Sequence, residues 1–194
     1  MKMRDVNIVI VGVGGQGTLL TSKLLARLAM EENFGVKVSE VHGMAQRGGS
    51  VITHVRIGKN VHAPLVASGS ADYLLAFEPL EAARAIAYLK DDGILIVNSQ
   101  QVSPITVLSG AVEYPENPHL QVVQDSQTVE ALDAFSLAVE AGNHRSLNLV
   151  LLGVLSKHLP FTQEDWDHAI AACVPPRTLE VNRKAFKAGR NRTN

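Results

Sequence analysis

The stretch that decides the fold is Val6-Asn7-Ile8-Val9-Ile10-Val11-Gly12-Val13-Gly14-Gly15-Gln16-Gly17. Residues 6–11 form a β-branched run with a single polar residue, which predicts a parallel strand buried on both faces. Glycines follow at once, and between residues 16 and 32 the leucines recur at helical spacing. A strand, a glycine turn and a helix in this order predict an α/β domain that opens with a phosphate-binding turn.

The rest of the chain continues the α/β pattern and then becomes helical. Short apolar or alternating runs predict further strands over residues 36–41, 50–57, 73–77, 94–97 and 120–124. Helices are predicted over residues 80–89, 126–141 and 147–159, from Thr162 with a capping box to Asp165, and from Pro176 to a stop at Gly189. We therefore expect a three-layer, Rossmann-like, mostly parallel sheet with a helical C-terminal third, forming a single domain over residues 1–194.

Composition limits the classes of partner and cofactor. The 194 residues are 46% hydrophobic, enough for one substantial core, and 18 basic residues balance 19 acidic ones. This balance predicts no nucleic-acid partner and no anionic membrane surface. No apolar stretch approaches the roughly 20 residues that span a bilayer, and the N-terminal residues make a poor signal peptide. We therefore expect a cytoplasmic protein with no membrane association.

The glycine turn supplies the first candidate ligand site. Gly12 allows a tight turn, Gly14 lets the backbone approach a phosphate, and Gly17 permits close packing of the following helix on the strand. The free N–H groups of the helix end would face the ligand. We take the cofactor-binding candidates from this turn: Gly12, Gly14, Gly15, Gln16 and Gly17. The alternative is a tight βα turn that holds no nucleotide.

A nicotinamide dinucleotide would require an acidic residue at the end of the second strand, about 20 residues after the turn. Glu40 lies near that place, but Val41 and His42 follow it before the next glycine. NAD binding is therefore possible on the sequence and is not the favoured interpretation.

The loop that follows the second predicted strand supplies further candidates, Gln46, Arg47, Gly48 and Gly49. The Arg47 guanidinium can hold a phosphate or carboxylate through two hydrogen bonds, and the two glycines let the backbone approach the same ligand. The alternative is that Arg47 pairs with an acid such as Glu40 or Glu78 at a subunit interface.

The remaining polar residues indicate no catalytic or metal site. The seven histidines, His42, His54 and His62 among them, have no metal-ligand spacing. The single cysteine, Cys173, lies among apolar residues and is expected to be a buried, inert thiol. Because the chain has only one cysteine, its thiolates alone cannot form an iron–sulfur cluster or a zinc site. Glu78 could line the ligand crevice or simply cap the next helix.

Three segments together resemble a known family. They are Gly14-Gly15-Gln16-Gly17, His42-Gly43-Met44-Ala45-Gln46-Arg47-Gly48-Gly49-Ser50-Val51 and Asp72-Tyr73-Leu74-Leu75-Ala76-Phe77-Glu78-Pro79. They look like the beta subunit of indolepyruvate:ferredoxin oxidoreductase, a family similar to the gamma subunits of 2-oxoacid:ferredoxin oxidoreductases. Residues 148–153 and 181–186 resemble that family's C-terminal helices.

The resemblance implies a reaction and a set of partners. Such enzymes oxidatively decarboxylate a 2-oxoacid, here an arylpyruvate, on thiamine diphosphate, pass electrons through iron–sulfur clusters to ferredoxin, and release an acyl-CoA. This chain has no Gly-Asp-Gly thiamine motif with its following asparagines and only one cysteine. We therefore expect thiamine diphosphate, magnesium and the clusters on a large alpha subunit, and no cofactor on this chain alone.

The expected role of the chain is thus to complete a heteromeric complex, inactive by itself, with the glycine turn and the Arg47 loop holding the CoA phosphates or shaping the mouth of the active site. Two alternatives are a stand-alone Rossmann-type nucleotide-binding module or NAD(P)-linked oxidoreductase, and a pure interaction subunit with an empty cradle.

Overall fold

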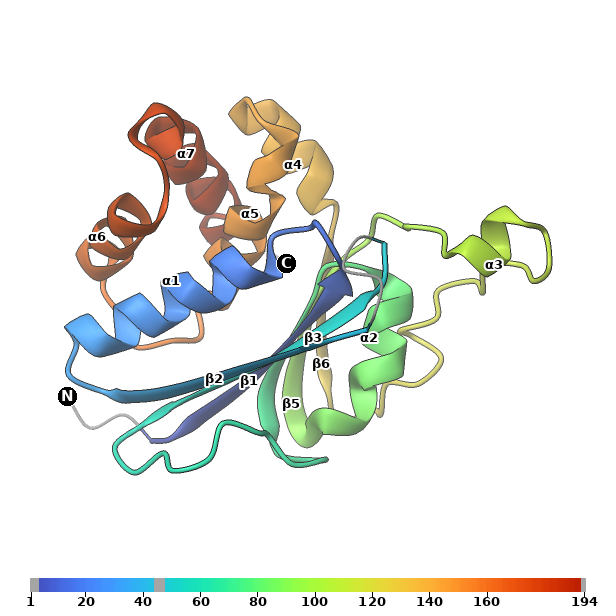
Figure 1. Ribbon diagram of the computed structural model, residues 1–194, viewed down its shortest axis with the longest axis horizontal. Helices are drawn as coiled ribbons and strands as arrows, with labels where there is room; N and C mark the ends of the chain where they lie inside the picture. Colours follow the sequence, from blue (N-terminus) through green and yellow to red (C-terminus); the bar gives the residue numbers. More distant parts are fainter. Residues whose placement is uncertain (1–3, 44–47, 193–194) are drawn as a thin grey trace.

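The computed structural model describes residues 4–43 and 48–192, and it contains a six-stranded sheet in the order β2-β3-β1-β4-β5-β6 (Figure 1). β1 pairs in parallel with β4, β4 with β5 and β5 with β6, whereas β3 lies antiparallel between β2 and β1. The mostly parallel sheet expected from the sequence is confirmed, with β3 as its antiparallel member. The strands are β1 (Val6–Val13), β2 (Gly35–His42), β3 (Ser50–Gly58), β4 (Ala71–Ala76), β5 (Leu89–Asn98) and β6 (Thr128–Leu132).

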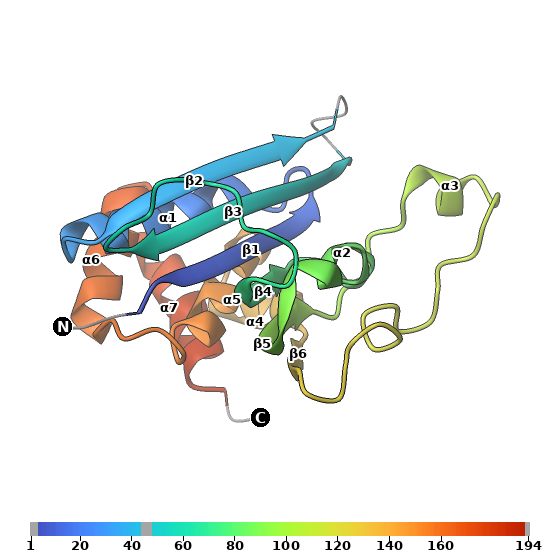
Figure 2. The same ribbon diagram turned by 90° about the horizontal axis from the view of Figure 1, so that it is seen from below.

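Helices cover the two faces of the sheet unequally. Figure 1 shows α1 and the C-terminal helices on one face and α2 on the other, and Figure 2 shows the same division from below. Among the described residues, no helix is long and apolar enough to pass through a membrane. The helices are α1 (Thr18–Glu31), α2 (Pro79–Ala85), α3 (Ile105–Leu108), α4 (Ala134–Ala141), α5 (Leu147–Leu155), α6 (Gln163–Cys173) and α7 (Leu179–Arg190), with 3₁₀ turns η1 (Ile86–Tyr88), η2 (His144–Ser146) and η3 (Pro176–Thr178).

β1 lies at the centre of both cores because its two faces are apolar. Ile8 and Ile10 join the core beneath α1 and the C-terminal helices, and Val9 and Val11 join the core beneath α2. All four side chains are almost completely buried. The β-branched run at the start of the chain therefore fixes the middle of the sheet, and the glycine turn leaves from its carboxyl end.

The C-terminal helices form a tight pair. Every residue of α5 is buried, and α5 packs against α7 through glycines on both helices. A Cβ atom on Gly153 would lie 2.1 Å from the Phe186 carbonyl oxygen, and one on Gly189 would lie 1.9 Å from the Val150 carbonyl oxygen. Gly189 was expected to end the last helix, and α7 ends one residue later, at Arg190. The absence of a side chain on Gly189 also allows the backbones of α5 and α7 to touch.

Two predictions in the middle of the chain are wrong, one for the position of the last strand and one for the start of the next helix. Residues 120–124 form no strand, and the last strand is β6, eight residues later. The helix predicted over residues 126–141 begins only at Ala134, where the Asp133 side chain caps α4 by accepting a hydrogen bond from the Ser136 amide. The sequence pattern did not indicate β6 because this strand carries a buried acid, Glu130. Its cationic partners, Lys157 and His158, are distant in the sequence.

Several local predictions are confirmed. Thr162 and Asp165 form the predicted capping box at the start of α6. The structure adds that this helix buries Trp166 and Ile170 completely. The helix predicted to end at residue 141 does so, and Gly142 follows it in the left-handed conformation with a φ of 112°. The helix expected over residues 80–89 ends earlier, because Leu89 already begins β5.

Candidate functional site

The carboxyl ends of β1, β4 and β5 meet at the backbone of Phe77. Phe77 donates its amide to the Val11 carbonyl oxygen at 2.9 Å. Its own carbonyl oxygen accepts from the Gln16 side-chain amide at 3.3 Å and from the Asn98 side-chain amide at 3.1 Å. The chain leaves β1 toward one face of the sheet and β4 toward the other, which makes this edge the place where ligands bind in open α/β sheets.

The Gln16 side chain holds the glycine turn in shape. Its amide oxygen accepts a hydrogen bond from the Val13 amide at 2.7 Å. A Cβ atom on Gly12 would lie 2.8 Å from that same oxygen and 2.9 Å from the Cβ of Phe77. Gln16 is thus committed to the turn itself, and Gly12 is required by the close approach of Gln16 and Phe77.

Gly15 and Gly17 adopt backbone conformations that favour glycine, with φ values of 105° and 97°. A Cβ atom on Gly15 would meet nothing within 4 Å, so this part of the turn faces open space. A Cβ atom on Gly17 would lie 3.2 Å from the Nδ2 atom of Asn148 on α5. The close packing expected at the third glycine is therefore made with a C-terminal helix rather than with the strand.

The N-terminus of α1 opens onto the turn. Gly17 is the N-cap residue and offers no side chain, so no side-chain hydrogen bond caps the helix. The first-turn amides of a helix have no intrahelical partner and carry partial positive charge. This end of α1 can accept an anionic group.

The second candidate loop lies directly against the first. The Gly14 amide donates to the Gly49 carbonyl oxygen at 2.8 Å, and the Gly48 amide donates to the Gly14 carbonyl oxygen at 3.4 Å. The structure therefore brings Gly48 and Gly49 to the glycine turn, as a shared site requires. Gln46 and Arg47 lie outside the described residues.

A cavity of about 410 Å³ lies beside the glycine turn, between α1 and the start of α5. Gly15, Gln16 and Gly17 form one wall. The opposite wall includes residues that the sequence analysis did not nominate, namely Leu20, Gln100, Val102, Phe135, His144, Arg145, Leu147 and Asn148. The cavity combines apolar walls with a few polar groups, as ligand pockets usually do.

Asn148 is the unusual polar residue of this cavity. It is only 2% exposed, and its Oδ1 atom is buried without a hydrogen-bond partner. A buried acceptor that lacks a donor carries a desolvation cost of about 1–3 kcal/mol. Arg145, which is exposed, follows His144 in η2 and lines the same cavity. Arg145 can therefore pair with an anionic group of a ligand in the cavity.

A second cavity, of about 560 Å³, lies on the other side of the turn and includes Glu40 and His42. Glu40 is not placed like the acid of a dinucleotide site. It pairs across β3 with Thr53, and Thr53 pairs with Ile10, so Glu40 is level with the middle of β1. β3 lies between β2 and β1, and neighbouring strands are about 4.8 Å apart, so Glu40 is two strand spacings away from β1. This arrangement differs from that of dinucleotide dehydrogenases, in which the acid ends the strand beside β1.

Glu78 has both of the roles considered for it. Its side chain caps α2 by accepting from the Glu81 amide at 2.9 Å, and it also lines a third cavity of about 490 Å³. The Tyr114 hydroxyl donates to the same carboxylate. Burial raises the pKa of the Tyr114 phenol, and the hydrogen bond to Glu78 raises it further. Tyr114 therefore stays neutral and keeps donating.

Cys173, at the end of α6, is half-buried, and burial raises the pKa of its thiol. It remains a thiol at neutral pH and is a poor nucleophile and a poor metal ligand.

Comparison with known proteins adds the family to this geometry. Residues 7–192 match the family model described as pyruvate ferredoxin/flavodoxin oxidoreductase. The indolepyruvate oxidoreductase subunit IorB of Thermococcus kodakarensis is 42% identical over 192 residues, which covers 96% of this chain and 95% of the relative. The chain belongs to the pyruvate ferredoxin/flavodoxin oxidoreductase family.

Two solved structures show the same fold as this chain. The gamma subunit of a keto/oxoacid ferredoxin oxidoreductase from Geobacter sulfurreducens superposes with a TM-score of 0.71 at 25% identity, covering 95% of this chain and 96% of that one. The 2-oxoglutarate:ferredoxin oxidoreductase from Magnetococcus marinus, solved with 2-oxoglutarate, coenzyme A and succinyl-CoA bound, gives 0.74 at 18% identity, with 97% of this chain covering 31% of that one. The same fold thus occurs both as a separate subunit and as one part of a longer chain.

Proposed function

We propose that this chain is the small, cofactor-free subunit of an indolepyruvate (arylpyruvate):ferredoxin oxidoreductase in the cytoplasm, and that residues 1–194 act as one gamma-type domain. The observation that carries the proposal is the 42% identity to an indolepyruvate oxidoreductase subunit over 96% of the chain. The partner is a large alpha subunit, and electrons leave the complex to ferredoxin.

The donor groups of this chain do not fit the redox cofactors of the reaction. An iron–sulfur cluster needs several thiolates, and the single thiol here has a raised pKa. The sequence also lacks a thiamine diphosphate motif. Thiamine diphosphate, its magnesium ion and the clusters therefore belong to the proposed partner, where they would supply the chemistry of decarboxylation and the path for electrons.

The residues of the glycine turn fit a phosphorylated substrate better. The uncapped start of α1 and the exposed Arg145 can hold phosphate oxygens. We assign this cavity to the phosphate-bearing part of coenzyme A, with Arg47 as an additional phosphate ligand. In this arrangement the chain binds and orients CoA while the partner provides the reacting groups.

Co-expression with the large subunit tests the assignment. The proposal predicts a stable complex that oxidises indolepyruvate with ferredoxin and CoA, while the chain alone shows no activity. The proposal is refuted if no complex forms and if the large subunit oxidises arylpyruvate at the same rate with and without this chain.

Titration of the purified chain and of the complex with CoA, NAD and NADP separates this function from a stand-alone nucleotide-binding module. Micromolar binding of a nicotinamide nucleotide, with no response to CoA in the chain or in the complex, would favour the module. If neither ligand binds, the chain is an interaction subunit with an empty cradle.

A further inference from the structure

Residues 99–127, which connect β5 to β6, form an arm that projects from the body of the molecule (Figure 1, Figure 2). A connection between parallel strands is normally a helix that packs back onto the sheet. Here the only regular element is the four-residue helix α3. The connection therefore leaves most of its apolar residues outside both cores, although Val123 packs against the core beneath α2.

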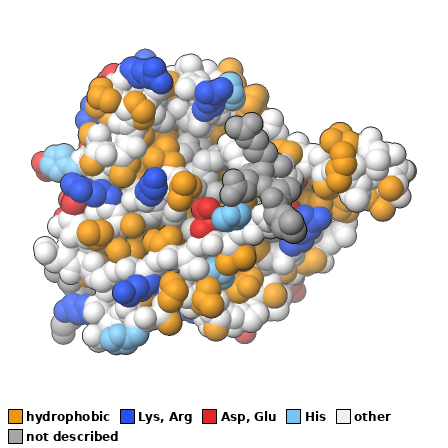
Figure 3. All heavy atoms as spheres, viewed as in Figure 1, with side chains coloured by type: hydrophobic (Ala, Val, Ile, Leu, Met, Phe, Trp, Pro, Cys, Tyr) orange, Lys and Arg blue, Asp and Glu red, His pale blue; other side chains and the backbone are white. Residues whose placement is uncertain are grey.

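The arm concentrates exposed apolar side chains. Among the described residues, eleven large hydrophobic side chains are exposed, and five of them lie on this arm: Ile105, Leu108, Val112, Leu120 and Val122. Ile105 is 76% exposed and Leu108 is 71% exposed, more than any other large hydrophobic side chain of that set. Figure 3 shows hydrophobic side chains gathered on the projecting end. Scattered exposed apolar residues are ordinary, but a contiguous group on one segment marks an interaction surface.

The base of the arm is held firmly. Glu78 accepts hydrogen bonds from the Tyr114 hydroxyl and from the Val102 amide, the latter at 3.3 Å. At the other end, the Gln127 side-chain amide donates to the Lys90 carbonyl oxygen at 3.0 Å. These hydrogen bonds join the arm to the body near both of its ends and at Tyr114.

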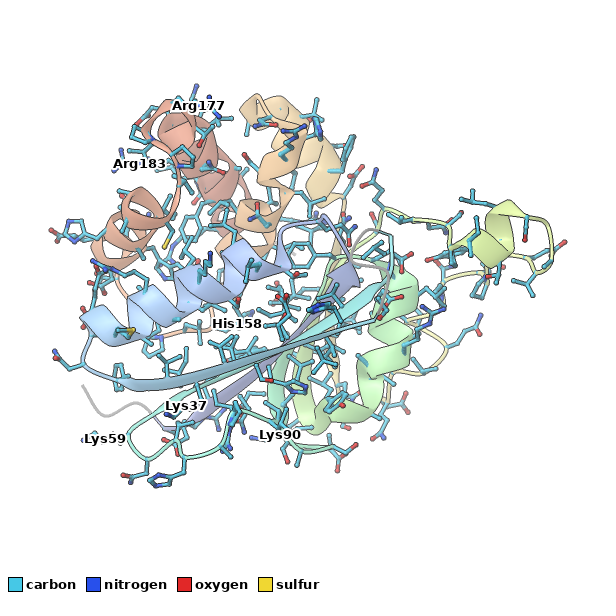
Figure 4. The ribbon with its side chains drawn as sticks, in the orientation of Figure 1. Lys37, Lys59, Lys90, His158, Arg177 and Arg183 are labelled. Carbon is cyan, nitrogen blue, oxygen red and sulfur yellow. The ribbon has the colours of Figure 1, made fainter. Side chains whose placement is uncertain are left out.

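The charge of the arm specifies the chemistry of that partner. Between residues 91 and 144 the sequence contains no lysine or arginine, and the charged side chains of the arm are Glu113, Glu116 and Asp125. All three are exposed. Among the lysines and arginines labelled in Figure 4, Lys90 lies at the base of the arm, where its carbonyl oxygen accepts from Gln127, and the others lie on the body of the molecule. An apolar surface with only acidic charges complements an apolar groove bordered by lysine and arginine.

The arm also begins beside the proposed CoA site. Val102, in its first residues, lines both the 410 Å³ cavity at the glycine turn and the 490 Å³ cavity that continues along Ile105 and Leu108. A partner that covers the arm would therefore also close over the edge where the ligand is bound.

We propose that this acidic, apolar arm is the surface that docks into an apolar groove, bordered by basic residues, on the large subunit. The inference rests on the proposed function for the existence of that subunit, and it deepens it by assigning the contact. Ile105 and Leu108 are the central apolar contacts, and Glu113 and Glu116 form ion pairs at the border. Docking places the large subunit against the cavity at the glycine turn.

The test measures the affinity of the full-length chain for the purified large subunit. The double variant Ile105→Ser/Leu108→Ser should raise the Kd by at least about tenfold, because central apolar contacts carry most interface energy. The matched control Met30→Ser/Leu65→Ser removes two exposed apolar side chains from the body and should leave the Kd within about twofold. Both variants should keep the melting temperature of the wild type, since all four side chains are exposed.

Charge is tested separately. Glu113→Gln/Glu116→Gln should weaken binding at low salt and reduce the loss of affinity that the wild-type complex shows as salt is raised.

Three outcomes would overturn the proposals. If Ile105→Ser/Leu108→Ser binds the large subunit within about twofold of the wild type, the docking proposal alone is overturned. A wild-type chain that fails to bind the large subunit would overturn the proposed function together with it. Loss of a self-association of this chain in the arm variant, with unchanged affinity for the large subunit, would assign the arm to a second copy and also overturn the proposal.

Discussion

Asn148 of α5 lies directly over Gly17 at the start of α1, where a Cβ atom would come within 3.2 Å of the asparagine Nδ2. This contact joins the first helix of the chain to the C-terminal helical layer at the wall of the proposed ligand site. It explains why a glycine is needed at a position where the sequence alone suggested packing of helix on strand.

Gly17→Ala should therefore destabilise the fold by more than its neighbour Gly15→Ala. Both residues have a positive φ, which costs an alanine about 1–2 kcal/mol. Only Gly17 also faces a side chain, since a Cβ atom on Gly15 meets nothing within 4 Å. Urea unfolding of the two variants checks this order. Equal losses of unfolding free energy would show that Asn148 can move aside at no cost.

Gly189→Ala reverses the usual effect of this substitution inside a helix. Alanine normally stabilises a helix interior by about 1 kcal/mol relative to glycine. Here the new Cβ atom would lie 1.9 Å from the Val150 carbonyl oxygen, so α5 and α7 would have to separate. We expect a loss of about 1–3 kcal/mol, the range typical of overpacked cores. Urea unfolding measures it, and Lys187→Ala on the exposed side of α7 is the control. A stabilised Gly189→Ala variant would contradict the tight helix pair.

The buried Glu130 links stability to pH. Burial raises its pKa, but hydrogen bonds from Lys157 and His158 outweigh this effect, so the pKa lies below its ordinary value. A lowered pKa in the folded state gives stability that is present above the unfolded pKa of about 4.3 and is lost as the pH falls through the folded value.

Glu130→Gln should accordingly cost about 1.5–3 kcal/mol at pH 7, the typical value of a charged hydrogen bond. The difference from the wild type should shrink as the pH falls below about 4.3, because the unfolded wild-type carboxylate then takes up a proton, and it should vanish once the pH falls below the lowered pKa of the folded state. Urea unfolding at several pH values measures the difference. Glu180→Gln, whose side chain is 79% exposed, should show almost none. A difference that stays constant down to low pH would show that the ion pairs do not stabilise the fold.

Much of the fold could be predicted because local signals coincide with tertiary structure. The β-branched run of β1 and the capping box at Thr162 each depend on a few neighbouring residues, and both are confirmed. Strand β6 was missed because Glu130 is buried only with partners, Lys157 and His158, that come from the turn after α5. The role of Gly189 was missed because the sequence does not show which backbone it touches.

The candidate site was predictable in part for the same reason. The glycine turn and the helix that follows it are local features, and their proximity to Gly48 and Gly49 follows the expected position of the second loop. Arg145 and Asn148 carry no local motif. Only the packing of α5 against α1 brings them to the turn, about 130 residues after it in the sequence.

Arg145→Ala should weaken the binding of coenzyme A to the assembled complex without affecting its assembly. A lost hydrogen bond between a guanidinium and a phosphate costs about 1.5–3 kcal/mol, which raises the Kd by roughly 10-fold to 150-fold. Arg47→Ala should have an effect of the same size if both side chains hold phosphate oxygens. Calorimetric titration of the complex with CoA measures each change. The exposed Arg177 lies on the C-terminal helices (Figure 4), so Arg177→Ala should leave the Kd unaltered and serves as the control.

Assembly and ligand binding have to be measured on the same variants, because the two candidate roles of Arg47 predict opposite results. If Arg47 pairs with an acid at a subunit interface, Arg47→Ala weakens the complex and leaves the affinity of the remaining complex for CoA unchanged. If it holds a phosphate, the complex forms normally and the affinity for CoA falls. Arg145 lies in the wall of the cavity itself, so an unchanged Kd in Arg145→Ala would exclude this cavity as the CoA site whatever Arg47 does.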